Sequence, residues 1–381
     1  MKGSLQTKGG KFYAVFRVNG KQKWFNLHIE DKKGNKRKAE KALAELIHQY
    51  NENPHMFAKT DFCEYIQKWL NNVKTHVDIV TYEGYDITTR NHILPYFKEK
   101  KLALQDVNIS DLEAFYNLKA VSGRLDGKDG GMSYRSIKMF ATIFSLVFKY
   151  AQRECLVRDN PAEKAQLPKL EKKVAKISFY NVDECNELLK ASAGTHLHDI
   201  IAITILYGLR RSEIMGLCWD AIDFENNTLE IKHTRVLNKT VVAKDKTKTD
   251  SSHRVYPLLP EIREILLRIK DEQTDNARVF GENYNDSGYI FVNELGEPFY
   301  PSYPTTMLTK LFKHHPELRK IRFHDLRHSC ASVLLEKGWS MKAISDWLGH
   351  SEIGITMNLY THIDLDSKRE RAKTLGGMLE L

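Results

Sequence analysis

Residues 208–213 read Gly208-Leu209-Arg210-Arg211-Ser212-Glu213 and overlap the end of an apolar run that extends from Ile200 to Leu209. The run is too short to cross a bilayer and predicts a buried helix. Gly208 permits a close backbone approach at the end of that helix, and Glu213 can orient the Arg210 guanidinium from one helical turn away. Arg211 is the rival arginine, but its side chain would point about 100° away around a helix. A purely structural Arg–Glu pair is the alternative.

Three more motifs follow along the chain. They are Lys248-Thr249, then His324-Asp325-Leu326-Arg327, and then Leu348-Gly349-His350 with Tyr360 ten residues later. His324 and Arg327 would share one face of a helix, while Asp325 and His328 would point elsewhere. Lys248 lies in a polar loop between two strand-like runs, where Lys244 and Lys246 are its rivals.

These residue types suit the cleavage of a phosphodiester without a metal. Such a reaction needs a nucleophile, a charge clamp on the phosphate and an acid for the departing oxygen. Arginine suits the clamp because its planar fork binds two phosphate oxygens and keeps its charge. Histidine transfers protons near neutral pH. A tyrosine phenol is normally protonated at pH 7, but neighbouring arginines and a histidine would favour its ionisation.

In this order and spacing, the motifs resemble the active site of the tyrosine recombinase, or phage integrase, family over about residues 60–381. The resemblance implies that Tyr360 attacks the scissile phosphate and forms a 3′-phosphotyrosine link. It implies that Arg210, Arg327 and His350 stabilise the transition state, and that Lys248 and His324 act as acid and base. No metal, ATP or other cofactor is then required.

The function that the resemblance implies is that of a site-specific DNA recombinase, which integrates and excises a mobile element of a phage or a conjugative transposon. A cellular chromosome-dimer resolvase of the same family and a non-catalytic DNA-binding protein on the same fold are the alternatives. The basic segment over residues 1–57 disfavours the resolvase. A metal-dependent transposase is disfavoured because no carboxylate triad is apparent.

The predicted fold class is multidomain α+β. Residues 1–57 read as a hairpin around Asn19-Gly20, the strongest two-residue hairpin signal, with a short strand near Ser4–Gln6 and a helix from about Ala39 to Asn51. Residues 58–167 read as all-helical, residues 168–176 as a linker, and residues 177–381 as a mixed, mainly helical part. The resemblance makes these an arm-type DNA-binding domain, a SAM-like core-binding domain, and a catalytic domain of the tyrosine recombinase fold.

Two amphipathic stripes predict the core of the helical part, because aromatic residues at helical spacing are usually buried. One comprises Phe62, Ile66, Trp69 and Leu70, and the other comprises Ile137, Phe140, Ala141, Phe144, Val147, Phe148 and Ala151. In the last part, helices are expected to start near Asn181 and Asp199. A strand is expected after the Asn226-Asn227 turn within residues 223–231, with further strands near Val241 and over residues 254–258.

Charge points to a polyanionic partner. The net charge is +9, and residues 1–57 hold twelve Lys and Arg against five Asp and Glu, a net +7. Arg17, Lys21 and Lys23 are predicted to line one strand face for DNA, with Phe12, Phe16 or Trp24 packed on the helix. The linker lysines are further candidates, unless they form a solvated charge run: Lys169, Lys172 and Lys173.

The implied partner is double-stranded DNA, bound at core and arm attachment sites by four protomers. An excision factor and a host DNA-bending protein are implied as further partners, and residues 365–381 are expected to dock on a neighbouring protomer. The N-terminus lacks a signal peptide's apolar segment, so no membrane and a location in the bacterial cytosol at the nucleoid are expected. Five widely spaced cysteines predict buried free thiols, with no disulfide and no zinc site.

Overall fold

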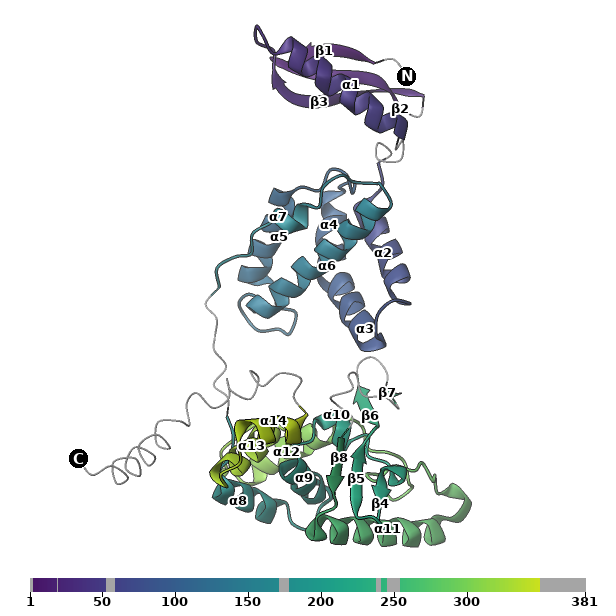
Figure 1. The fold of residues 1–381 in the computed structure, drawn as a ribbon, viewed down its shortest axis with the longest axis vertical. Helices are drawn as coiled ribbons and strands as arrows, with labels where there is room; N and C mark the ends of the chain where they lie inside the picture. Colours follow the sequence, from purple (N-terminus) through teal and green to yellow (C-terminus); the bar gives the residue numbers. More distant parts are fainter. Residues whose placement is uncertain are drawn as a thin grey trace, which may run out of the picture. The chain divides into compact units, whose positions relative to one another are not determined.

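The computed structural model describes residues 3–18, 20–52, 59–170, 178–237, 241–244 and 254–349 (Figure 1). The chain divides into two compact units, residues 1–174 and 175–381. Within the first unit, the described residues before and after residues 53–58 have separate hydrophobic cores.

The N-terminal part is a three-stranded antiparallel sheet covered by one helix (Figure 1). The strands are β1 (Ser4–Lys8), β2 (Lys11–Val18) and β3 (Lys21–Glu30), and the helix is α1 (Lys36–Glu52). The short first strand is therefore confirmed, and it pairs with β2 over its full length. The helix starts three residues before its predicted start. Residue 19 of the predicted turn lies outside the described residues.

The strand register corrects the predicted basic face. Arg17 pairs with Gln22, and Val18 pairs with Lys21. Paired residues point to the same side of a sheet, and successive residues alternate. Lys21 and Lys23 therefore lie on the side of the buried Val18, which faces α1, whereas Arg17 lies on the opposite, uncovered side. The three cations do not share one face.

Trp24 lies on the uncovered side as well, because it pairs with Val15. Its side chain is 46% exposed and meets the ring of Tyr13 edge-on at 6.1 Å. Of the three aromatic residues named as alternatives for packing on the helix, Trp24 is therefore not one that does so. Phe16 does pack there, with its ring 5.5 Å from that of Tyr50.

The helical part confirms both predicted stripes. Its elements are α2 (Phe62–Val73), α3 (Ile79–Thr88), the π-helical turn η2 (Thr89–Ile93), α4 (Leu94–Lys100), α5 (Ile109–Ser122), α6 (Tyr134–Arg153) and α7 (Pro161–Lys164). The stripes of α2 and α6 form one core, in which only Ala141 among the predicted residues is partly exposed. Asp61 and Ser133 cap the two helices by accepting backbone N–H bonds.

The last unit is a mainly helical domain around a small antiparallel sheet of order β4-β5-β8, with a separate hairpin of β6 and β7. Its first elements are α8 (Val182–Ser192), α9 (His196–Tyr207), α10 (Arg211–Ile214), η3 (Trp219–Ala221), β4 (Ile222–Asp223), β5 (Thr228–Ile231), β6 (Thr234–Leu237), β7 (Val241–Lys244) and β8 (Arg254–Pro257). The rest are α11 (Pro260–Phe280), η5 (Gly281–Asn283), α12 (Tyr303–His314), α13 (Asp325–Glu336) and α14 (Met341–Leu348).

The apolar run forms α9, which is buried along most of its length in the core of this unit. The helix starts at His196, capped by Thr195, three residues before the expected start. The strand expected after the Asn226-Asn227 turn is confirmed as β5, and the residues before the turn form the short strand β4, with Asn227 at φ 52°.

All five cysteines are free, as expected, but burial is not uniform. Cys155 is exposed and Cys218 is partly buried, which corrects the expectation of buried thiols at these two positions. No helix among the described residues is long and apolar enough to span a membrane.

Candidate active site

The end of α9 lies directly against the end of α14. Gly208 follows α9 with φ 64°, a conformation that glycine adopts without strain. A Cβ at this position would lie 2.2 Å from Cδ2 of Leu348. The close backbone approach predicted at Gly208 is therefore confirmed, and α14 is the element that approaches.

Arg210 precedes the short helix α10 and is held by Glu213. Its Nη1 donates to Oε1 of Glu213 at 2.6 Å, and its backbone N–H donates to Oε2 at 2.8 Å. Burial by itself would raise the pKa of Glu213, but the charges of Arg254 and Arg210 lower it below its usual range, so the carboxylate stays ionised. Arg211 points elsewhere and donates to Oγ1 of Thr305. Arg210, and not its rival Arg211, is therefore the arginine that contacts Glu213.

Arg327 joins Arg210 at the end of α14. It is 2% exposed, and it donates from Nη1 to the Gly208 carbonyl and from Nη2 to the Leu348 carbonyl, both at 2.6 Å. Arg210 donates from Nη2 to the next carbonyl, that of Gly349, at 3.1 Å. Two arginines that are far apart in sequence are thus anchored on consecutive carbonyls.

Positive charge in this cluster exceeds the negative charge that balances it. Burial, followed by the charge of Arg210, lowers the pKa of Arg327 to about 9. Among the described residues, Glu213 is the carboxylate that offsets the charges of Arg210, Arg254 and Arg327. A guanidinium does not lose its proton in proteins, so Arg327 stays charged although it is buried, and a bound anion would offset this charge.

Sequence reasoning missed Arg254, which is 8% exposed at the start of β8. Its Nη2 lies 3.0 Å from Oε2 of Glu213, and its Nε donates to Oη of Tyr256 at 2.7 Å. Alternation along β8 was the available signal. Arg254 and Tyr256 share the inward parity, whereas Val255 between them is 58% exposed.

His324 lies at the start of α13, with one side exposed to solvent. Partial burial, followed by the charge of Arg327, lowers its pKa. The expectation for His328 is wrong, because its ring lies edge-on to that of His324 at a centroid distance of 5.3 Å. Asp325 does point elsewhere, toward Arg322, which it binds at 2.7 Å.

Two family models match this chain. The model of the Phage integrase family covers residues 179–366, and that of the Phage integrase N-terminal SAM-like domain covers residues 61–118. The chain belongs to the phage integrase family. The first match contains all six predicted catalytic positions, and the second begins one residue before α2.

Relatives of this integrase include XerC-type tyrosine recombinases and transposases from transposons. It is 29% identical over 322 residues to a tyrosine recombinase XerC-like protein of Caldanaerobacter subterraneus, covering 78% of this chain and 77% of that protein. It is 25% identical over 299 residues to the transposase from transposon Tn916 of Enterococcus faecalis, covering 76% and 72%.

A solved structure with a similar fold is that of the Tn1549 transposon integrase in complex with a circular intermediate DNA. The TM-score is 0.64 at 22% identity, covering 84% of this chain and 100% of that one. Together with the family models, this similarity confirms the predicted fold class. Family membership and the relatives confirm the predicted activity, that of a site-specific recombinase of the integrase type.

Three predicted catalytic residues of the integrase, Lys248, His350 and Tyr360, lie outside the described residues, as does Lys246. The structure thus brings together Arg210, Glu213, His324 and Arg327, and it describes the chain up to Gly349. The linker lysines Lys172 and Lys173 also lie outside, whereas Lys169 is exposed.

Elsewhere in the described part of the integrase, Cys218, Asp220 and His233 form one group whose ligand atoms lie within 4.8 Å of one another. No pattern in the sequence indicated this group. Asp220 already binds Nε2 of His233 at 3.0 Å, and Nζ of Lys232 lies 3.7 Å from its carboxylate. A cation bound there would have to displace this ammonium.

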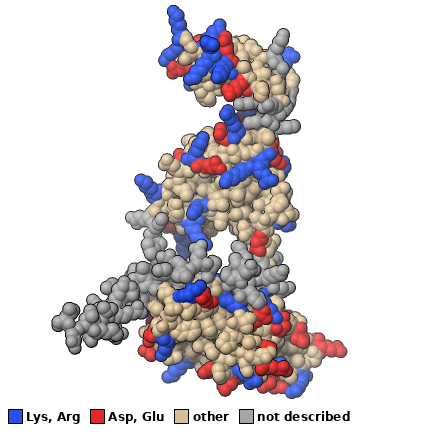
Figure 2. Space-filling model, viewed as in Figure 1, with Lys and Arg blue, Asp and Glu red and all other residues tan. Residues whose placement is uncertain are grey.

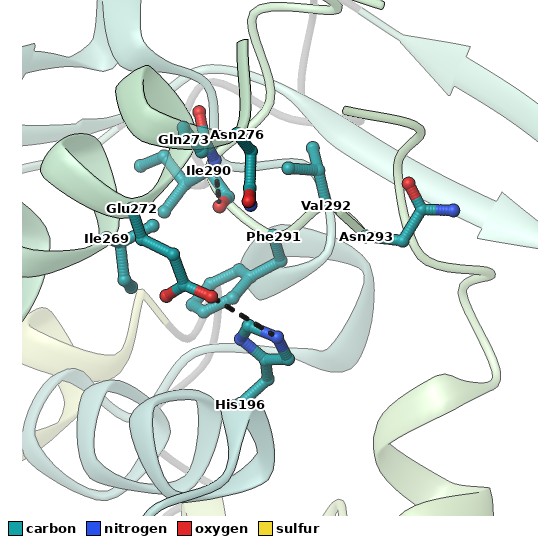
Figure 3. A pocket seen from close by; sticks show the side chains of 9 residues that line it. All are labelled: His196, Ile269, Glu272, Gln273, Asn276, Ile290, Phe291, Val292 and Asn293. Carbon is teal, nitrogen blue, oxygen red and sulfur yellow. Dashed lines mark hydrogen bonds and ion pairs between the residues drawn. The ribbon is translucent and has the colours of Figure 1, made fainter. Parts of the chain in front are cut away.

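A small pocket lies between α9 and α11 (Figure 3) and shares no residue with the arginine cluster. Gln273 donates from its amide to the Ile290 carbonyl at 2.8 Å, and it accepts from Nε1 of Trp219 at 2.9 Å. His196 and Glu272 face each other at 4.0 Å. These contacts fasten α11 to its neighbours, so the pocket serves the fold of the integrase.

Proposed function

We propose that this integrase cuts and rejoins double-stranded DNA through a 3′-phosphotyrosine intermediate, with Tyr360 as the nucleophile. The observation that carries the proposal is the anchoring of Arg210 and Arg327 on the Leu348 and Gly349 carbonyls. His350 is the next residue, and Tyr360 follows ten residues later. The residues that immediately precede the nucleophile segment thus bind the two arginines whose positive charge would bind the phosphate.

In the proposed reaction, Oη of Tyr360 attacks the phosphorus, and the bond from phosphorus to the 5′ oxygen breaks. Lys248 gives a proton to that oxygen, while Arg210, Arg327 and His350 stabilise the charge on the non-bridging oxygens. A 5′ hydroxyl of the partner duplex then attacks the phosphotyrosine and releases the phenol. The phosphodiester bond is exchanged without net loss, so the sequence of steps is balanced without ATP.

His324 is proposed to take the proton from Tyr360. Partial burial and the charge of Arg327 lower the pKa of His324, so the imidazole is neutral near pH 7 and able to accept a proton. The adjoining His328 ring holds its orientation edge-on. The surrounding arginines disfavour the protonated imidazole, so His324 stays unprotonated and can accept the proton.

For arm-type DNA, we propose the uncovered face of the N-terminal sheet as the contact surface, since α1 covers the other face. This face carries Arg17 and the exposed Trp24. Figure 2 shows lysine and arginine side chains on the visible side of the N-terminal part, where α1 lies in front of the sheet. Strands can enter a groove of DNA as a ribbon, and a net +7 over residues 1–57 supplies attraction to phosphates.

The further elements of the proposal follow the family resemblance. Residues 1–57 act as the arm-type domain, 58–167 as the core-binding domain, 168–176 as the linker and 177–381 as the catalytic domain. Four protomers act on two DNA segments in the bacterial cytosol at the nucleoid, with an excision factor and a host DNA-bending protein as partners. The substrate is the attachment site of a phage or conjugative transposon.

Covalent capture tests the proposal directly. Wild-type protein is incubated with a randomised pool of nicked duplexes, and the DNA that resists removal by SDS is sequenced and resynthesised. The Tyr360→Phe variant should bind the captured duplex with the same affinity and yield no SDS-resistant complex, because only the attacking oxygen is missing. An adduct formed by this variant refutes Tyr360 as nucleophile, and a wild-type protein that forms no adduct favours a non-catalytic DNA-binding role.

A further inference from the structure

Three consecutive carbonyls at the C-terminal end of α14 each accept a hydrogen bond from a different side chain. The Trp347 carbonyl accepts from the Tyr256 hydroxyl, the Leu348 carbonyl from Arg327, and the Gly349 carbonyl from Arg210. The last carbonyls of a helix have no partner within the helix and carry partial negative charge. The end of α14 therefore favours the binding of two cations and a hydroxyl.

A buried chain of polar contacts runs from the catalytic Arg210 to the same helix end. Arg210 binds Glu213, Glu213 binds Arg254, and Arg254 donates to the hydroxyl of Tyr256. That hydroxyl in turn donates to the Trp347 carbonyl. Arg254 is also the first described residue after residues 245–253, the segment that carries Lys248.

We propose that Arg254 and Tyr256 are positioning residues for DNA cleavage. Arg254 follows the segment that carries Lys248, and Tyr256 contacts the end of α14. Through Arg254, both are linked to the Arg210–Glu213 pair. We expect these contacts to fix the positions of the acid, the two arginines and the nucleophile relative to one another. This inference rests on the proposed function, since it assigns Lys248 and Tyr360 their roles.

Stability alone gives little reason for this network. A buried ion pair gains little over well-packed apolar residues, because both charges must lose their water. The ring of Tyr256 already packs between Tyr207 and Trp347, at centroid distances of 5.1 and 4.8 Å. The hydrogen bonds of its hydroxyl and of the Arg254 guanidinium are directional, whereas the packing of the rings is not. Direction matters for catalysis, because a displacement of 1 Å can reduce a rate by roughly 10²-fold.

Removal of one hydroxyl tests the proposal, and Tyr207 offers a matched control. Tyr207 is a buried tyrosine of the same aromatic cluster, but its hydroxyl donates to the Pro257 carbonyl and accepts from the Leu259 N–H, outside the arginine network. The full-length Tyr256→Phe variant should cleave the captured nicked duplex roughly 10- to 100-fold more slowly than wild type, with unchanged affinity for that duplex. The Tyr207→Phe variant should cleave at the wild-type rate. Equal rates for the two variants, whether both fast or both slow, overturn the proposal.

A second variant separates positioning from a loss of folding. Arg254→Lys keeps the charge beside Glu213, but an ammonium cannot bind Glu213 and Tyr256 through a rigid planar fork. Its cleavage rate should fall roughly tenfold or more. Part of this loss should return on a duplex with a 5′-bridging sulfur, which leaves without a proton from Lys248. A wild-type rate, or no recovery with sulfur, contradicts the assignment, whereas absence of any wild-type adduct contradicts the proposed function instead.

Discussion

Substitution of Gly208 by alanine should reveal how closely the fold and the active site are joined. The new Cβ would lie 2.2 Å from Cδ2 of Leu348, so this buried side chain must shift within the packing of α9 and α14. Alanine also has to adopt φ 64°. The backbone conformation costs about 1–2 kcal/mol, and forcing a methyl group into a packed contact costs about 1–3 kcal/mol. The expected loss in free energy of unfolding is therefore about 2–5 kcal/mol.

Gly338 provides the matched control, because it has φ 83° and nothing lies within 4 Å of the position that an alanine methyl group would occupy. Gly338→Ala should show the conformational cost of about 1–2 kcal/mol without the clash. For a unit of this size, 1 kcal/mol lowers the Tm by about 2–4 °C. Thermal unfolding followed by tryptophan fluorescence measures both variants, since Trp219, Trp339 and Trp347 belong to this unit.

The clash has a specific partner, which allows a double-mutant test. In a Leu348→Ala background the Gly208→Ala change should cost about 1–3 kcal/mol less than in wild type. Cleavage should also suffer in the single variant, by roughly 10²-fold, because Arg327 binds the Gly208 carbonyl. Equal destabilisation by Gly208→Ala and Gly338→Ala, or strict additivity with Leu348→Ala, would refute the reasoning.

Three further predictions concern protonation, the general acid and the DNA-binding sheet. Burial, followed by the charge of a protonated His324, lowers the pKa of His328 to about 4, so the unfolded chain takes up the proton first as the pH falls below about 6.5. Stability should therefore decline from about pH 6.5 toward pH 4, and His328→Gln should flatten that decline in Tm; superimposable pH profiles would exclude this origin. Lys248→Ala should slow cleavage and regain its rate on a 5′-bridging sulfur duplex, while a Lys246→Ala protein with that same phenotype would transfer the role of acid. Arg17→Gln should reduce the salt dependence of arm-DNA binding by about one phosphate contact, whereas an unchanged slope would place the contact surface elsewhere.

Local patterns were sufficient to predict the helices and half of the site. The stripes of α2 and α6 became the core of the helical part because periodicity alone determines which face of an amphipathic helix is buried. Arg210 and Glu213 are neighbours in the chain, so their contact follows from helical spacing.

Contacts between distant segments could not be read from such patterns. Arg254 meets Glu213 across 41 positions, and its role depends on the pairing of β8 with β5. The side on which Arg17 lies could, by contrast, be read from the sequence. A two-residue turn at residues 19–20 pairs Val18 with Lys21, which places Arg17 on the side opposite to Lys21 and Lys23. His328 is a second exception, because its contact with His324 follows from helical spacing: the two residues are four apart, and His324 has helical dihedrals.

The binding site at the end of α14 consists of the main-chain carbonyl oxygens of residues 347–349. Substitution of the side chains along this helix end would leave those oxygens in place, so it would measure only the effect of side-chain packing. Chemical protein synthesis reaches them, because an ester in place of an amide weakens a single carbonyl as an acceptor while the side chains stay the same. Esters installed one at a time would measure how strongly the backbone holds each arginine, and hence what a phosphate must overcome to recruit it.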